Sequence, residues 1–129
     1  MDQPLSTTLS QINTDTSLSY IAWNDENPNG TTTSVKAHSK TVLIYNNATL
    51  NGIVLVHSIP KYPNFTSNKV DPTIADGQRI YGQHILCFRA TSEIMKELID
   101  LSSVIRRNVY ASNANIPAEK KSDSKGLVM

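Results

Sequence analysis

The sequence has little of several features that define whole classes of protein. Among its 129 residues there is a single cysteine, Cys87, which excludes an internal disulfide framework and a cysteine-based zinc site. No run approaches the roughly 20 apolar residues that a transmembrane helix needs, so we expect no membrane contact. The N-terminal residues MDQPLSTTLS lack the basic and apolar regions of a signal peptide, so we expect none.

Charge is also scarce. Lys, Arg, Asp and Glu make up 18% of the chain, and the net charge is +1 when the three histidines are counted as neutral. A chain with so little excess charge is not suited to binding polyanions at neutral pH. Protonation of all three histidines at about pH 5 would carry the net charge towards about +4 and favour such binding.

The hydrophobic content of 39% suffices for one domain with a real core. Stretches of β-branched and aromatic residues predict strands, and apolar residues three and four apart predict helices. We predict an α/β (mixed α+β) fold over residues 1–117, in which helices flank a mixed β-sheet, and a disordered polar tail at 118–129. The expected strands are 18–23, 41–46, 51–58 and 84–90, the expected helices are 5–12 and 92–107, and residues 60–80 are expected to form a long irregular loop.

The segment SEIMKELIDLSSVIRR gives the clearest helix prediction. Ser92 is the expected N-cap, Glu93 lies in the first turn, and two arginines lie in the last turn, where they complement the helix dipole. One apolar stripe is expected to face the core, formed by Ile94, Leu98, Leu101 and Ile105.

The two strands around the turn NATL predict a hairpin whose register has a chemical consequence. If Asn46 faces Asn51, Lys40 lies opposite His57, and His38 lies two residues away on the same face as Lys40. Three cationic or titratable side chains would then meet at one end of the sheet. A slip of one residue would send His57 to the other face, so the expectation depends on the register.

A His-x-Lys pair on one strand face suits phosphoryl chemistry. The imidazole can act as nucleophile or acid, while the ammonium offsets charge on the phosphate oxygens. His38 and Lys40 form such a pair, although a lone triplet of this kind often arises by chance. His57 has two interpretations here: a structural histidine at a sheet edge, or a site residue at a strand exit. A zinc site is disfavoured, because no carboxylate lies near the histidines in the sequence.

Five segments, taken in order, resemble the N-terminal half of the deoxyribonuclease II family of acid endonucleases. GIVLVHSIPKYP is the strongest match and is similar to the family's Trp-Leu-Val/Ile-His-Ser-Ile/Val-Pro-x-Phe-Pro segment. AHSKTVLIYN resembles its Gly-His-Thr-Lys-Gly strand, with Ala37, Ser39 and Thr41 in place of the glycine, threonine and glycine. The other segments are YIAWNDENP, YGQHILCF and RNVYASNANIP, so the resemblance covers roughly residues 5–117.

The resemblance implies a single phospholipase D-like lobe and a metal-independent acid endonuclease that needs no cofactor. Such an enzyme would hydrolyse DNA phosphodiester bonds through a histidine nucleophile and leave 3′-phosphate ends. His38 and Lys40 match the family's first His-x-Lys motif, and His57 matches an additional family histidine, which favours its interpretation as a site residue. The same segment makes Ser58 and Lys61 candidates for substrate binding.

Some family features have no counterpart in this sequence: the second His-x-Lys motif, the signal peptide of these lysosomal or secreted enzymes, and their first strand. Two hypotheses follow, with DNA as the partner in both. In one, the chain is catalytic as a homodimer in which each copy contributes His38 and Lys40 to a single site. In the other, it is a truncated, non-catalytic lobe that only binds nucleic acid or a partner chain. The apolar surface that a missing second lobe would cover is then exposed.

Overall fold

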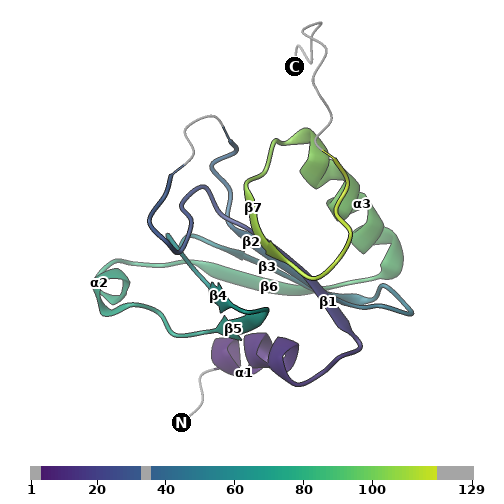
Figure 1. Cartoon of the computed structure of the whole chain (residues 1–129), viewed down its shortest axis with the longest axis horizontal. Coiled ribbons are helices and arrows are strands. Elements are labelled where there is room, and N and C mark those ends of the chain that lie inside the picture. The colour runs from purple at the N-terminus through teal and green to yellow at the C-terminus, as the bar shows by residue number, and fades with distance from the viewer. Residues whose placement is uncertain (1–3, 33–35, 119–129) are drawn as a thin grey trace, which may run out of the picture.

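The computed structural model describes residues 4–32 and 36–118 and shows a five-stranded sheet with helices on both faces (Figure 1). The strands lie in the order β6-β3-β2-β1-β7. Their bounds are Leu18–Trp23 for β1, Thr41–Asn46 for β2, Gly52–His57 for β3, Ile85–Ala90 for β6 and Val109–Ser112 for β7. The helices are α1 (Pro4–Ser10), continued by a 3₁₀ turn at Gln11–Asn13, α2 (Asp76–Arg79) and α3 (Ser92–Val104).

The α+β class is confirmed, and two strands, β1 and β2, have the predicted bounds. The sheet itself differs from the prediction of a mixed sheet, because every neighbouring pair of strands runs antiparallel. The strand β7 was not predicted, since its four residues lie in a polar segment that resembles a turn. The predicted polar tail falls almost entirely on residues 119–129, which lie outside the described residues.

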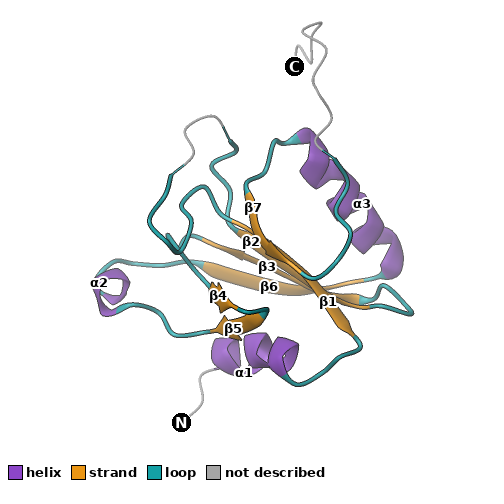
Figure 2. Cartoon of the chain, viewed as in Figure 1, coloured by secondary structure: helices purple, strands orange, loops and turns teal. Residues whose placement is uncertain are grey.

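Residues 60–80 are not the irregular loop that we expected. They contain a second, two-stranded sheet of β4 (Asn64–Thr66) and β5 (Lys69–Asp71), followed by α2 (Figure 2). The connection between β4 and β5 is Ser67-Asn68, and both residues have positive φ angles, 51° and 61°. A two-residue turn of this kind matches the twist of a hairpin and is compatible with asparagine.

Two hydrophobic clusters cover the two faces of the large sheet, as the apolar strands predicted. On the α1 face, alternate side chains of β1 and β2 pack with α1 and β5, in a cluster of Leu9, Tyr20, Ala22, Val42, Ile44, Leu55, Ile59, Tyr62 and Val70. On the α3 face, the intervening side chains pack with the helix, in a cluster of Ile21, Trp23, Leu43, Tyr45, Val54, Ala90 and Met95. None of the helices in residues 4–32 and 36–118 is long and apolar enough to cross a bilayer.

The hairpin of β2 and β3 has the predicted register. Thr41 pairs with Val56 and Tyr45 pairs with Gly52, so Lys40 and His57 are level with each other. Gly52 helps to hold this register, because a Cβ atom there would clash with the Ile44 carbonyl oxygen. The strand can approach its neighbour this closely only with glycine at that position.

The helix α3 corrects three predictions. Thr91, not Ser92, is the N-cap, since the Thr91 side chain accepts a hydrogen bond from the Ile94 amide. The helix ends at Val104, so the two arginines lie beyond it, and Arg107 is buried with its guanidinium donating to the Pro117 carbonyl oxygen. Of the predicted stripe, only Leu98 packs against the core, whereas the other three side chains are exposed: Ile94, Leu101 and Ile105.

Candidate active site

The cluster at one end of the sheet is centred on Asp25, which follows β1. One carboxylate oxygen lies 2.6 Å from His38 Nδ1, and the other lies 2.5 Å from Lys40 Nζ. The two partners differ in accessibility, because the His38 side chain is 86% exposed and the Lys40 side chain only 6%. Asp25 therefore joins an exposed imidazole to a buried ammonium and makes the His-x-Lys pair one electrostatic unit.

Asp25 was not predicted as a site residue from the sequence, in which no carboxylate lies near the histidines. The residue lies 13 positions before His38, but strand pairing closes that gap. Because Trp23 pairs with Thr41 and the strands are antiparallel, Asp25 falls level with the residues just before β2. A polar Asn-Asp pair directly after a buried strand was the signal that could have identified it.

Opposing influences act on the pKa of Asp25. Burial raises it, but the hydrogen bond from Lys40, the Lys40 charge and His38 together outweigh burial and lower the pKa below its ordinary value of 3.8. The carboxylate is therefore ionised over the whole range in which a histidine titrates.

The neighbouring residue, Asn24, attaches the cluster to the segment after β3. Its side chain is fully buried and donates to the carbonyl oxygens of Ile59 and Tyr62, both at 3.2 Å, while its carbonyl oxygen accepts from the Glu26 amide. The same short turn therefore positions Asp25 and supports the strand exit that carries His57.

His57 ends β3 and is level with Lys40, whose carbonyl oxygen accepts the His57 amide at 3.1 Å. Its ring packs edge-on against Tyr62, and Nδ1 accepts a hydrogen bond from the Ile59 amide at 3.2 Å. That contact assigns the proton of the neutral ring to Nε2, which is buried and has no hydrogen-bond partner within the described residues.

Burial, as the larger cause, and the nearby Lys40 charge together lower the pKa of His57 from 6.5 to about 4. His57 is thus neutral at about pH 5, contrary to the expectation that all three histidines gain charge there. Its buried Nε2 meets a substrate only if neighbouring side chains move. The structure places His57 beside Lys40 as expected, but as a neutral and buried group.

The two candidates for substrate binding occupy different environments. The Ser58 hydroxyl donates to Gln83 Oε1 at 2.6 Å and accepts from the His84 amide at 2.9 Å, so it joins the exit of β3 to the start of β6. Lys61 is exposed and lines a shallow cavity of about 340 Å³ with Tyr62 and neighbouring residues. A role in substrate binding stays a prediction for both.

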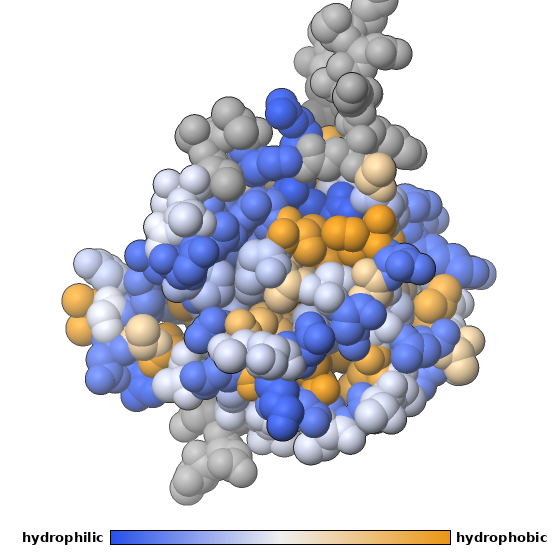
Figure 3. All heavy atoms as spheres, viewed as in Figure 1, coloured by the Kyte–Doolittle hydropathy of each residue, from blue (hydrophilic) through white to orange (hydrophobic). Residues whose placement is uncertain are grey.

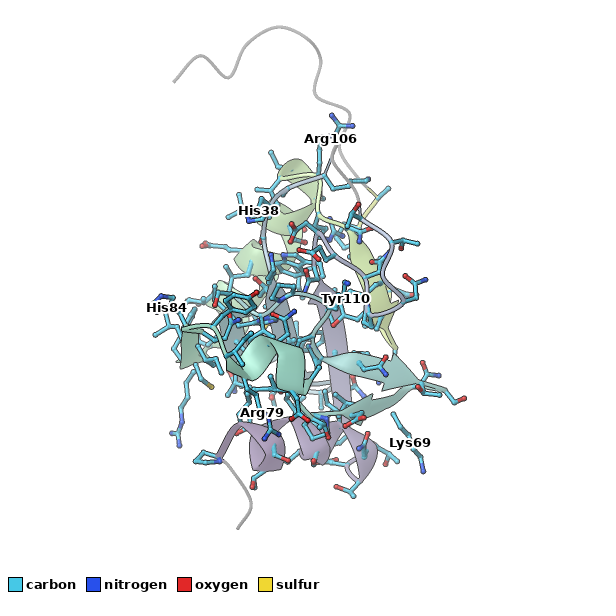
Figure 4. All side chains as sticks on the ribbon, turned by 90° about the vertical axis from the view of Figure 1, so that its left-hand side faces the viewer. His38, Lys69, Arg79, His84, Arg106 and Tyr110 are labelled. Carbon is cyan, nitrogen blue, oxygen red and sulfur yellow. The ribbon has the colours of Figure 1, made fainter. Side chains whose placement is uncertain are left out.

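The third histidine, His84, lies on the surface. Its side chain is exposed, and Figure 4 shows it well apart from His38. Within residues 4–32 and 36–118, no group of three or more His, Cys, Asp or Glu side chains is placed to hold a metal ion.

The family model for deoxyribonuclease II matches residues 1–128 of the chain, which is nearly its whole length. None of the curated proteins is similar enough to this sequence to count as a match.

Proposed function

This chain belongs to the deoxyribonuclease II family, and we propose that the cluster of Asp25, His38 and Lys40 acts on a DNA phosphodiester with His38 as the nucleophile. Family membership supports a deoxyribonuclease-like function with DNA as the substrate. The proposal adds the role of each residue, a metal-independent course and a site that one chain leaves incomplete.

The contact between Asp25 and His38 carries the proposal. A carboxylate oxygen 2.6 Å from Nδ1 holds the proton on that nitrogen and leaves the lone pair of the neutral ring on Nε2. Because the His38 side chain is 86% exposed, a phosphate can approach it without rearrangement of the fold. This is the usual arrangement of an activated nucleophile whose orientation is set by a third group.

The chemistry balances as two displacements. Nε2 of His38 forms a bond to phosphorus, the bond from phosphorus to the 5′-oxygen breaks, and that oxygen leaves with the electron pair and takes up a proton. Water then attacks the phosphohistidine, which frees Nε2 and leaves the phosphate on the 3′-oxygen. The Lys40 ammonium would offset charge on the phosphate oxygens, in place of the metal ion that other nucleases use.

The state of His57 favours a second candidate function, in which the chain binds DNA or a partner chain without cleaving it. The leaving 5′-oxygen needs a proton, but His57 is neutral at about pH 5 and its Nε2 is buried. The sequence contains one His-x-Lys pair, so a second imidazole acid of that type has to come from another copy or another lobe. A phospholipase D-like pairing of two lobes would supply it.

Plasmid nicking at about pH 5 in the presence of EDTA separates the two candidates. If His38 is the nucleophile, the parent protein nicks DNA and His38→Ala lowers the rate by several powers of ten, because the covalent step is lost. His84→Ala is the matched control, since it removes an exposed histidine outside the cluster and should leave the rate unchanged.

A parent protein that binds DNA but does not nick it would establish the second candidate, and His38→Ala would then lower affinity only modestly. Nicking that EDTA abolishes, or that survives His38→Ala, would overturn the proposed chemistry.

A further inference from the structure

The strand β6 is an edge strand without the protection that edges usually have. Natural edge strands carry lysines, prolines or bulges, which prevent pairing with another chain. β6 has no proline and pairs with β3 over its whole length without a bulge, and its one charge is Arg89. Its apolar side chains are open to solvent, with exposed fractions of 42% for Ile85, 60% for Leu86 and 39% for Phe88.

Two hydrogen bonds show which backbone groups of β6 point away from β3. The His57 amide donates to β2 and the Ser58 amide donates to the His84 carbonyl oxygen, so even-numbered residues of β3 and β6 bond to each other. Hydrogen-bonding groups alternate along a strand. The outward-facing amide and carbonyl groups therefore belong to Ile85, Cys87 and Arg89.

We infer that β6 pairs antiparallel with β6 of a second copy of this chain, around a two-fold axis through Cys87. This register places Ile85 opposite Arg89 of the second copy and Cys87 opposite its own counterpart, so all three outward residues are paired. Registers centred on Leu86 or Phe88 leave one of the three without a partner inside the strand.

The side chains agree with that register. Leu86 falls opposite Phe88 of the second copy, and such aliphatic–aromatic pairs stabilise antiparallel strands. The two arginines do not meet, because each lies opposite an isoleucine. A second copy thus satisfies the edge without placing like charges together, which a pairing centred on Arg89 would not do.

The surface beside the edge extends the same interface. The register places Leu86 and Phe88 on the α3 face of the sheet, together with Val56, which is 40% exposed. A two-fold axis normal to the sheet puts both α3 helices on that face, where Ile94 and Leu101 are 44% and 54% exposed. Stable dimers bury roughly 1,600 Å², and the strand edge together with this helix face offers apolar area for it.

This dimer keeps the two clusters apart and does not depend on the proposed function. His57 is level with Ile85, two residues from the axis, so the two copies of His57 lie at opposite ends of the joined strands. With strands about 4.8 Å apart and about 3.4 Å of rise per residue, their Cα atoms are roughly 20 Å from each other. The β6 dimer is therefore not the homodimer that would combine two His38–Lys40 pairs on one phosphate.

Cys87 makes the interface directly testable. It is the sole cysteine of the chain and is exposed, and residues in a hydrogen-bonded antiparallel pair have Cα atoms about 5.5 Å apart, within disulfide range. We expect the purified chain to have the mass of a dimer in solution and to form a covalent dimer on mild oxidation. Cys87→Ser should abolish the covalent dimer, while the variant in solution should still have the mass of the non-covalent dimer.

Charge substitutions test the register. Leu86→Lys should give a folded monomer, because it buries an ammonium opposite Phe88, whereas Ile80→Lys, at a side chain 78% exposed outside β6, should leave the dimer intact. Leu86→Lys combined with Phe88→Glu should restore the dimer, since each lysine then faces a glutamate of the second copy. Circular dichroism confirms that each variant is folded.

A chain that stays monomeric and does not cross-link would overturn the inference, as would a dimer that Leu86→Lys leaves unchanged. Mass and cross-linking are measured without DNA. A negative result in these two measurements therefore contradicts the β6 dimer alone, whereas an absence of nicking contradicts the proposed function alone.

Discussion

Asp25 holds two side chains of opposite accessibility, an exposed imidazole and a buried ammonium, and the cluster depends on that one carboxylate. Lys40 is almost fully buried, and a buried charge is tolerated only when it is paired. The same carboxylate selects the tautomer of His38. Structure and chemistry at this site therefore have a common origin in one residue.

Asp25→Asn should lower the free energy of unfolding by on the order of 3 kcal/mol, because it leaves the Lys40 ammonium without its counter-charge. Urea unfolding measures this loss. The control is Asp76→Asn, at a carboxylate 99% exposed, which should change stability by no more than about 0.5 kcal/mol. Equal effects of the two substitutions would mean that the ion pair contributes nothing to the fold.

His57 predicts a dependence of stability on pH. Its pKa is about 4 in the folded chain and near 6.5 in the unfolded chain, so the unfolded chain binds the proton first as pH falls. The free energy of unfolding should fall between about pH 6.5 and pH 4, by on the order of 3 kcal/mol. Asp25 contributes only below its ordinary pKa of 3.8, outside this window.

The measurement is urea unfolding across that pH range for the parent and for His57→Asn, whose amide oxygen can still accept the Ile59 amide. His57→Asn should flatten the curve, and His84→Asn, at an exposed histidine, should not. A curve that stays steep in His57→Asn would assign the pH dependence to other groups.

Among the elements, α3 shows how one residue at a helix end is selected by backbone conformation. Thr91 has extended backbone angles, φ −69° and ψ 166°, which allow its hydroxyl to reach the Ile94 amide. Ser92, the next residue, is already helical, and its own amide donates to the Asn51 side chain at 2.9 Å. Both residue types are good N-caps, so composition alone did not decide between them.

Thr91→Ala should therefore cost about 1 kcal/mol of stability, which corresponds to a fall in Tm of about 4 °C for a domain of this size. Ser92→Ala should have almost no effect, since its side chain is not the cap. Thermal unfolding of the two variants decides the assignment, and a larger loss in Ser92→Ala would reverse it.

For the whole molecule, basic and acidic residues are nearly equal in number, and apolar side chains lie both in the core and on the surface. On the face shown in Figure 3, apolar side chains gather between β7 and α3 and are bordered by polar ones. The net charge is +1 when the histidines are counted as neutral. His57, whose pKa is lowered to about 4, does not add to that charge at about pH 5, contrary to the prediction from the sequence.

We expect affinity for a short DNA duplex to rise from about pH 7.5 to about pH 5 and to be unaffected by EDTA, because the net charge of a protein becomes more positive as the pH falls and positive charge attracts phosphates directly. Fluorescence anisotropy at constant salt measures it. His57→Asn should preserve the rise, because His57 stays neutral down to about pH 5. Binding that weakens on acidification, or that needs a divalent metal, would contradict this account.

The sequence by itself determined the features that arise from neighbouring residues. β1 and β2 have the predicted bounds, and the register of β2 with β3 follows from a short turn, so the placement of Lys40 beside His57 was predictable. The family was recognised from the segments around His38 and His57, and its model matches the chain. Local hydrogen bonds and alternating apolar residues suffice for such conclusions.

Only the tertiary structure decided the features that join distant segments. Asp25 meets His38 and Lys40 because β1 pairs with β2, and His57 is neutral because Tyr62 and the rest of the core exclude water around it. The exposure of apolar side chains on α3 and β6 was also decided by the tertiary structure. An apolar stripe in the sequence does not show which of its side chains will be buried against another element. Burial and electrostatics depend on the sum of all neighbours in space, and a linear pattern records only those along the chain.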